Sequence, residues 1–325
     1  MEHLFQSITI INPRSFTEAN EYLLLLLMNL FFIVFTLHAT LFTKAQAANI
    51  QRINYLPEQF FEMSFSFEQQ KKSNISQSEN IKWSQSEIQK FSASFGRKIS
   101  KYILLGGELE AESFSGIDLM RGNLDDQESR TAGLSKLKLW SIFRLREQSG
   151  ETSLWDWFLS YSPRLGDAKV DARIGNRLIG GHGIHTGFAN GYLILPWEFR
   201  FSVFFEQLSR REIQSFNQNL EISPFYKYGF SFQTQYSFSQ LNHLLFEVSV
   251  FQESIQKFKT NSFVKELQLG SRSKFDLGYK KMLTQFHLIY FGISTSVGEY
   301  YIKNQQSIEG NLMFNSVFLK WAAEF

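Results

Sequence analysis

Two histidines, His182 and His185, lie in the glycine-rich stretch 175–191. Of all parts of the sequence, this stretch has the residue types most suited to a reactive site. Imidazoles three positions apart could ligate a metal, and His185 could act as a general base. However, no acidic residue or cysteine lies nearby to complete a metal site, and the residue two positions after His185 is Gly187 rather than a serine nucleophile. We therefore expect the glycines to allow a bent loop, with no metal, no cofactor and no enzymatic activity.

Charged residues recur at every second position in several stretches, which places them on one face of a strand. If neighbouring strands are antiparallel, acidic and basic rows come to lie opposite one another. Such rows could form an electrostatic constriction that selects a polar or charged solute, or they could form ion pairs that fill and stabilise a narrow interior. The mixed signs favour ion pairs. The candidate residues are Glu108, Glu110, Glu112, Lys136, Lys138, Arg144, Arg146, Lys169, Asp171, Arg173, Glu198 and Arg200.

Apolar residues occupy the alternate positions, so the elements that carry these rows are predicted to be strands. The pattern is clear in Trp197–Phe205 and in Ala168–Ile174, whereas both faces of 286–293 are apolar and its register cannot be assigned. The sequence predicts an all-β, antiparallel chain of about twelve strands; ten or fourteen also fit. Long polar connections such as 69–86 and 209–221 alternate with short ones such as 147–151.

The end of the chain supports a particular kind of barrel. Apolar residues stand at every second position up to the last residue: Val317, Leu319, Trp321, Ala323 and Phe325. A final strand of this kind, ending in phenylalanine, resembles the C-terminal strand of bacterial outer-membrane β-barrels. The resemblance implies that this strand closes a transmembrane barrel, and that the barrel-assembly machinery recognises it.

The first residues of the chain have the pattern of an export signal. An uncharged run, Tyr22–Phe35, is followed by Ala45, Gln46 and Ala47, which is the form of a signal-peptide cleavage site. The segment before the run is acidic and long, so translation starting at Met28 is an alternative. We expect residues 1–47 to be a cleaved signal peptide, 48–58 a short periplasmic segment and 59–325 the barrel. A retained transmembrane helix is the competing interpretation.

Composition agrees with a barrel in a membrane. The chain has 325 residues, 16% aromatic residues and 20% charged residues, with a mean hydropathy of −0.20. This average is too polar for a bundle of membrane helices, but it suits strands that expose one face to lipid. A soluble β-barrel or sandwich would also alternate, yet it would need fewer aromatic residues. The absence of cysteine excludes disulfides, and the net charge of +2 argues against nucleic-acid binding.

Three functions follow from these expectations. The first is a porin-like channel for small polar solutes in the bacterial outer membrane, with outer-membrane lipid as its surroundings. The second is a closed structural barrel, or a surface-interaction barrel that acts through its long extracellular loops. The third is an outer-membrane hydrolase that uses His182 and His185.

Overall fold

A computed structural model describes the chain over residues 54–75, 82–116, 129–165, 168–169, 181–215, 218–259, 264–284, 287–303 and 308–324. The predicted signal peptide, residues 48–53 of the predicted periplasmic segment and the terminal Phe325 lie outside these residues. Within the described part of the chain, no helix is long and apolar enough to cross a membrane.

The regular elements of the described residues are strands, as expected where apolar and polar side chains alternate. The strands are β1 (Gln59–Ile75), β2 (Lys82–Ser100), β3 (Ile103–Gly116), β4 (Ser129–Arg146), β5 (Leu154–Ser162), β6 (Ala168–Lys169), β7 (Gly183–Ile194), β8 (Trp197–Leu208), β9 (Arg211–Ser215), β10 (Gln218–Ile222), β11 (Phe225–Ser237), β12 (Asn242–Glu253), β13 (Gln256–Lys259), β14 (Val264–Met282), β15 (His287–Lys303) and β16 (Ile308–Glu324).

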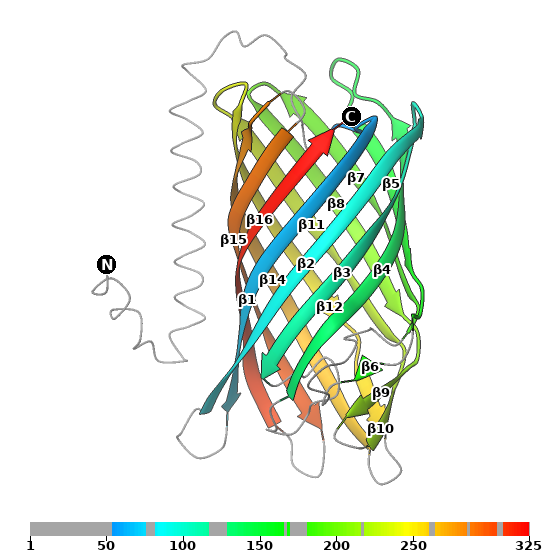
Figure 1. Cartoon of the computed structure of the whole chain (residues 1–325), viewed down its shortest axis with the longest axis vertical. Helices are drawn as coiled ribbons and strands as arrows, with labels where there is room; N and C mark the ends of the chain where they lie inside the picture. Colours follow the sequence, from blue (N-terminus) through cyan, green and yellow to red (C-terminus); the bar gives the residue numbers. More distant parts are fainter. Residues whose placement is uncertain are drawn as a thin grey trace, which may run out of the picture. The chain divides into compact units, whose positions relative to one another are not determined.

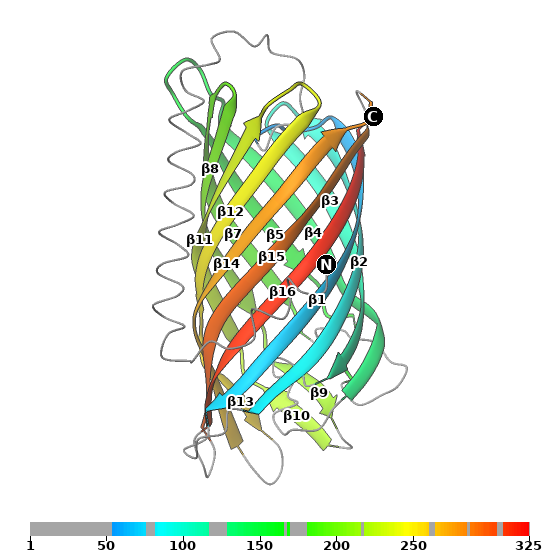
Figure 2. The same cartoon turned by 90° about the vertical axis from the view of Figure 1, so that its left-hand side faces the viewer.

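Twelve of these strands form a closed antiparallel ring, in the order β1, β2, β3, β4, β5, β7, β8, β11, β12, β14, β15 and β16 (Figures 1 and 2). The ring closes where the first strand bonds to the last: Phe60 lies opposite Glu324, and Ile75 lies opposite Glu309. Closure gives each of the twelve strands a hydrogen-bonded neighbour on both sides, so the ring has no edge strand. The predicted antiparallel barrel of about twelve strands is confirmed.

The two ends of the barrel differ. At the short-turn end, the strands are joined through residues 101–102, 147–153, 195–196, 238–241 and 283–286. This is the upper end in Figure 1, where β1 begins and β16 ends. At the long-loop end, the connections 163–182, 209–224 and 254–263 contain β6, β9, β10 and β13. The small strands β13, β10, β9 and β6 extend the sheet from the first residues of β14.

The outer face of the barrel is apolar around its circumference. Phe65 and Phe91 lie opposite each other on β1 and β2, and each is about half exposed, at 48% and 49%. Phe230 on β11 and Leu319 on β16 are exposed in the same way. The register also resolves the uncertain stretch before Ile293: Phe291 and Ile293 are exposed on the outer face, whereas Tyr290 lines the interior.

One predicted strand was wrong and one real strand was missed, so the strand count agrees although the assignment does not. Of the predicted strand 168–174 the structure describes Ala168–Lys169, which pair with β9 outside the ring, and residues 170–174 lie outside the described residues. The predicted bent loop instead contains the barrel strand β7. Its glycines face inward, since they alternate with the exposed Ile184 and Phe188, and large neighbours lie against them. A Cβ on Gly187 would come 2.5 Å from the ring of Phe158, and one on Gly191 would come 2.2 Å from Asn54 Oδ1.

Several barrel strands are longer than predicted. The polar stretch 69–86 was expected to be a loop, yet β1 continues to Ile75 and β2 begins at Lys82. Backbone hydrogen bonds between neighbouring strands do not depend on side-chain polarity. Alternating apolar residues therefore reveal only the part of each strand that has an apolar outer face.

Candidate functional site: the interior of the barrel

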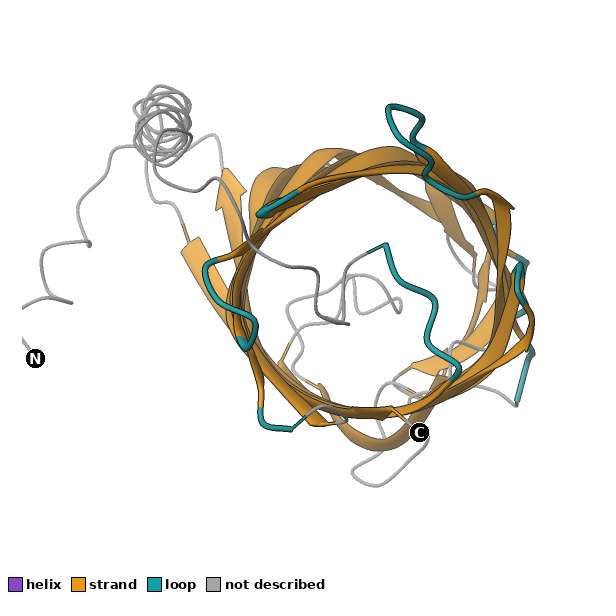
Figure 3. Ribbon diagram, turned by 90° about the horizontal axis from the view of Figure 1, so that it is seen from above, coloured by secondary structure: helices purple, strands orange, loops and turns teal. Residues whose placement is uncertain are grey.

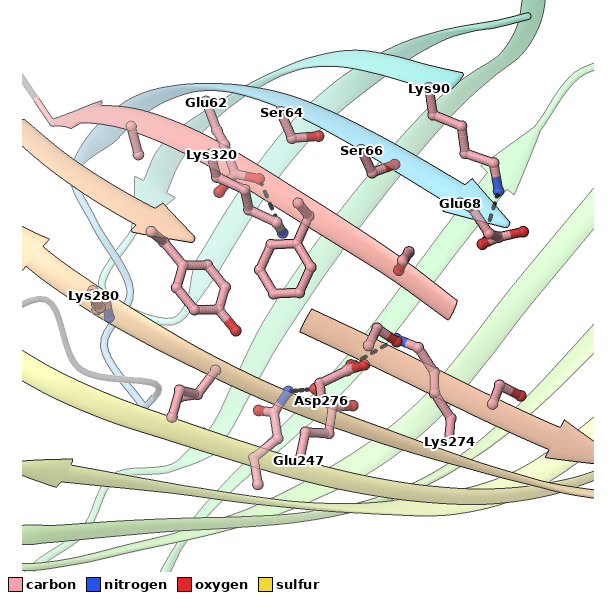
Figure 4. Close-up of a pocket in the computed structure, with 18 of the residues that line it drawn as sticks. Glu62, Ser64, Ser66, Glu68, Lys90, Glu247, Lys274, Asp276, Lys280 and Lys320 are labelled. Atoms are coloured by element: carbon pink, nitrogen blue, oxygen red, sulfur yellow. Dashed lines mark hydrogen bonds and ion pairs between the residues drawn. The ribbon is translucent and has the colours of Figure 1, made fainter. Parts of the chain in front are cut away.

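The interior holds a cavity of about 910 Å³, which we call the main cavity. Its lining comes from the inner faces of strands around most of the ring, including β1, β4, β12, β14, β15 and β16, and from residues just before β1. Figure 4 shows polar side chains of these strands pointing into it. The volume lies in the range of 300–1,000 Å³ that is typical of small-molecule sites.

Charged side chains of both signs line the main cavity. Five are carboxylates and six are cationic, so neither sign dominates the lining. The carboxylates are Glu62, Glu68, Glu112, Glu247 and Asp276, and the cationic residues are Lys90, Lys227, Arg272, Lys274, Lys280 and Lys320. This mixture does not favour selection of a strongly anionic or strongly cationic solute.

The ion pairs in the main cavity (Figure 4) differ in the distance between their nitrogen and oxygen atoms. Lys274 Nζ lies 2.6 Å from Asp276 Oδ2. Lys320 Nζ lies 3.5 Å from Glu62 Oε1, and both side chains are about one third exposed. Lys90 Nζ and Glu68 Oε2 are 4.0 Å apart. The last two distances exceed the 2.7–2.9 Å of a short charge-assisted hydrogen bond. These two contacts are therefore longer than the Lys274–Asp276 pair.

A fully buried carboxylate links three strands near the short-turn end. Asp156 on β5 has no exposed surface, and its two oxygens face two arginines. Arg144 Nε on β4 donates to Asp156 Oδ1 at 2.7 Å, and Arg200 Nη1 on β8 donates to Oδ2 at 3.0 Å. Because a buried charge is costly without partners, these hydrogen bonds stabilise the folded arrangement of all three groups. Arg144 and Arg200 were predicted to face the interior, but Asp156 was not among the candidates.

The segment Asn54–Glu58, which we call the strap, crosses the inside of the barrel at the short-turn end. Arg144 Nη2 donates to the backbone oxygen of Asn54 at 2.7 Å, and Asn54 Nδ2 donates to the backbone oxygen of Phe199 at 3.1 Å. These contacts hold one end of the strap against β4 and β8. Figure 3, which views the ring from above, shows a loop running inside it toward the wall near the C-terminus.

The other end of the strap is attached to the opposite part of the wall. Tyr55 donates from its hydroxyl to Glu324 Oε1 on β16 at 3.0 Å. Glu58 accepts a hydrogen bond of 2.7 Å from Lys98 Nζ on β2. Partial burial, together with Glu324, raises the pKa of the Tyr55 hydroxyl to about 12. Only a short periplasmic segment was predicted here, and the mixed polar and apolar residues of 48–58 gave no signal that its last part enters the lumen.

An apolar core occupies part of the long-loop end. Leu220 and Ile222 on β10 and Phe258 on β13 pack against Tyr300 on β15 and Leu312 on β16, and all five are almost completely buried. Residues 209–221 and 253–261 were predicted to be polar loops. In the structure they carry three short strands whose apolar side chains cover the inner wall, so the lumen is narrowed at this end too.

The structure brings part of the predicted charged rows together. Glu108 and Lys138 face each other on β3 and β4, with Nζ–Oε2 at 3.1 Å. Glu110 accepts a hydrogen bond of 2.7 Å from the Ser135 hydroxyl. Glu112 is buried and lines the main cavity. Lys136 lines a separate pocket of about 160 Å³, and Glu198 is buried on β8.

Other predicted interior residues lie elsewhere. A register shift between Arg144 and Arg146 turns Arg146 away from the row, so that it is exposed and donates to the backbone oxygen of Ser153 at 2.8 Å. Lys169 lies in β6, outside the ring, so the position predicted for it on a barrel strand was wrong. Asp171 and Arg173 lie outside the described residues.

The two histidines have different surroundings. His182 is exposed just before β7, and its Nδ1 lies 2.7 Å from the Tyr161 hydroxyl. His185 faces inward between the rings of Phe158 and Phe204, whose centroids are 5.1 and 5.7 Å away. Across the strands, Ser160 and Glu206 are the register partners of His185, but no hydrogen bond joins them among the described residues. The described part of the chain contains no group of acidic residues and histidines suited to a metal ion.

Sequence reasoning also missed a stack of cations and rings on the inner wall. The guanidinium of Arg272 on β14 lies 4.4 Å from the ring centroid of Phe314 and 5.2 Å from that of Phe251. Lys227 Nζ approaches Phe251 at 4.2 Å, on β12. Arg272 also pairs with Glu253 at 3.4 Å. The signal that could have revealed this stack is Phe251, which faces the interior on β12. The interior-facing residues of that strand had not been predicted.

No protein-family model and no curated relative matches this sequence. Similar folds occur among solved outer-membrane β-barrels. An outer-membrane channel from Pseudomonas putida F1 is 10% identical, with 87% of this chain and 100% of that chain covered and a TM-score of 0.56. A Pseudomonas aeruginosa FadL homologue is 7% identical, with 82% and 90% covered and a TM-score of 0.44. The transport unit of the Escherichia coli autotransporter AIDA-I is 10% identical, with 89% and 96% covered and a TM-score of 0.45. At these identities, the likeness concerns the fold alone.

Proposed function

We propose that this protein is a channel of the bacterial outer membrane that passes small polar solutes through its lumen, and that the strap restricts the passage. Three observations support location in a membrane: a closed ring of strands, an apolar outer face and a polar interior. In this arrangement the short-turn end faces the periplasm and the long-loop end faces the exterior, as in outer-membrane barrels generally.

The observation that carries the channel proposal is the main cavity itself. A barrel that served only as a scaffold could fill its interior with packed side chains. Here a space of about 910 Å³ stays open between β1 and β14, and it is lined by partly exposed charged groups such as Lys320 and Glu62. The fold of the Pseudomonas putida channel, which has a similar barrel, agrees with this function without identifying a solute.

The strap gives the proposed channel a gate at its periplasmic end. Tyr55, Leu56 and Pro57 form part of the cavity lining, so the strap lies in the path of a solute leaving toward the periplasm. Its attachments at Asn54 and Tyr55 consist of a few hydrogen bonds, each of modest net strength. Movement of the strap would open this end.

The test uses the absence of cysteine from the chain. Ser294 lines the main cavity on β15, whereas Ser239 is exposed in a short turn, so Ser294→Cys and Ser239→Cys form a matched pair. The protein would be purified from membranes of cells that express the full chain and studied in planar bilayers. A cationic methanethiosulfonate should reduce the current of Ser294→Cys and leave that of Ser239→Cys unchanged. Equal responses, or no current at all, would contradict passage through the main cavity.

A closed barrel that acts through its outer loops is the second candidate. The apolar core at the long-loop end, with Ile222 and Phe258 completely buried, favours it, because such a core can present an ordered surface to a partner. Heat-modifiable migration without any current would support this function. Hydrolysis involving His182 and His185 is the third candidate, and loss of lipid or peptide turnover in His182→Ala/His185→Ala would be its test.

A further inference from the structure

The lining of the main cavity includes a cluster of apolar side chains near the short-turn end. Near the short-turn end its inner wall is apolar, and we call this part the apolar wall; it consists of Phe60, Leu104, Trp140, Ile142, Leu288 and Phe318. Charged side chains lie beside the apolar wall, because Lys280 and Lys320 stand near the same ends of β14 and β16 and Glu62 follows Phe60 on β1. A solute in the main cavity therefore meets an apolar surface with charged groups beside it.

The apolar wall contains a flat aromatic surface. The rings of Phe60 and Trp140 stack, with centroids 5.8 Å apart and planes inclined by 26°. Gly96 and Gly106 lie behind them: a Cβ on Gly96 would come 2.4 Å from the Phe60 ring, and one on Gly106 would come 2.2 Å from Trp140. The two glycines thus make room for both rings to lie flat against the wall, which leaves the space beyond them for a ligand.

Charged groups of both signs lie close to this surface. Glu62 follows Phe60 by two positions on β1, so the two side chains share a face, and Lys320 lies 3.5 Å from Glu62 on β16. Neither side chain is buried, and their contact is long for a charge-assisted hydrogen bond. Glu62 can accept from an ammonium group while Lys320 donates to a carboxylate, so one ligand carrying both groups would satisfy both residues.

We propose that the main cavity binds small aromatic zwitterions, with the ligand ring against Phe60 and Trp140 and its ammonium and carboxylate groups at Glu62 and Lys320. The inference deepens the proposed channel function by naming the class of solute. A ligand without the ring loses the apolar contact. A ligand with a single charge leaves either Glu62 or Lys320 without a group of opposite charge on the ligand.

Binding can be measured without transport. The protein in detergent micelles would be equilibrated with phenylalanine, and binding would be compared with that of glycine, phenylpropionate and phenethylamine, using empty micelles to correct for partitioning. We expect phenylalanine to bind about tenfold more tightly than each of the other three, because each lacks one of the three interactions. Equal affinities for all four compounds would overturn the proposal.

Variants test whether phenylalanine binds at the apolar wall and at Glu62. Trp140→Ala should weaken phenylalanine binding about tenfold, whereas Trp155→Ala, which removes an exposed tryptophan of the outer face, should not change it. Glu62→Gln should remove the advantage of phenylalanine over phenylpropionate, and Lys101→Gln, in an exposed turn, should keep it. Heat-modifiable migration verifies that each variant is folded. Unchanged affinity in folded Trp140→Ala would overturn the proposal.

The outcomes separate this inference from the channel itself. Current without phenylalanine binding would refute the aromatic zwitterion as the solute and leave the channel function intact. Phenylalanine binding without current would establish the binding site and refute passage.

Discussion

Arg144 Nη2 donates a hydrogen bond of 2.7 Å to the backbone oxygen of Asn54, so a residue of the barrel wall holds a segment that precedes the first strand. The same guanidinium pairs with Asp156 through Nε. One arginine thus connects the stability of the wall with the position of the strap. This connection leads to separate expectations for folding and for conductance.

The buried carboxylate of Asp156 should matter far more for stability than the partly exposed carboxylate of Glu108. Asp156→Asn leaves two arginines without their shared charge, so we expect a loss of about 3–5 kcal/mol in the free energy of unfolding. Glu108→Gln breaks the Glu108–Lys138 pair, whose side chains are 27% and 29% exposed, and should cost about 0–1 kcal/mol. Urea unfolding in lipid vesicles measures both. Similar losses in the two variants would show that burial of Asp156 has no special effect.

The strap should be released by small changes at its attachments. Tyr55→Phe removes the hydrogen bond to Glu324, and we expect open steps that are more frequent than in the unaltered protein. Tyr102→Phe is the matched control, since Tyr102 is exposed in a short turn. Single-channel recording in planar bilayers measures the open probability. An unaltered open probability in Tyr55→Phe would argue against a gating role for this contact.

The strap should also respond to alkaline pH. The released Tyr55 hydroxyl ionises near pH 10, whereas the pKa of the attached hydroxyl is raised to about 12. The attached strap therefore binds the proton of the Tyr55 hydroxyl more tightly than the released strap. The resulting stabilisation of the attached state is complete below pH 10 and is lost as the pH rises toward 12. We expect the open probability to rise over this interval in the unaltered protein and in Tyr102→Phe, but not in Tyr55→Phe. A rise in all three would assign it to other groups.

A new charge should destabilise the barrel far more on the outer face of a strand than on its inner face. Phe91 and Ser92 are neighbours on β2, and Phe91 is exposed on the outer face, whereas Ser92 lines the interior beside Glu110. In a bilayer, Phe91→Lys should lower the free energy of unfolding by about 2–4 kcal/mol, as for lysine facing lipid at mid-depth, and Ser92→Lys should have a much smaller effect. Equal effects would place both residues in similar surroundings.

The fold was predictable from the sequence because lipid-facing and interior residues alternate over most strands. Trp197–Phe205 and the final strand show this pattern clearly, and both are barrel strands. Strand β7 escaped prediction because its inward positions are mostly glycine and alanine, which were taken as loop residues. The alternation of small residues with Ile184, Phe188 and Tyr192 is a signal that could have identified it.

The candidate site was less predictable than the fold. The pairing of Glu108 with Lys138 follows from adjacent strands, and alternation places both on one face. The contacts of Asn54 with Arg144 and Arg200, separated by 90 and 146 positions, depend on closure of the ring and on the path of the strap, neither of which is encoded in local patterns. The stacking of Phe60 on Trp140 likewise requires the register of four strands.

Single-channel conductance in a planar bilayer tests the central claim most directly, after heat-modifiable migration has shown that the barrel is folded. We predict stable open steps for the unaltered protein, and a higher open probability when Asn54→Ala and Tyr55→Phe are combined to remove the hydrogen bonds from the strap side chains to Phe199 and Glu324. A folded barrel that carries no current in either form would contradict the channel, and would favour a closed barrel that acts through its outer loops.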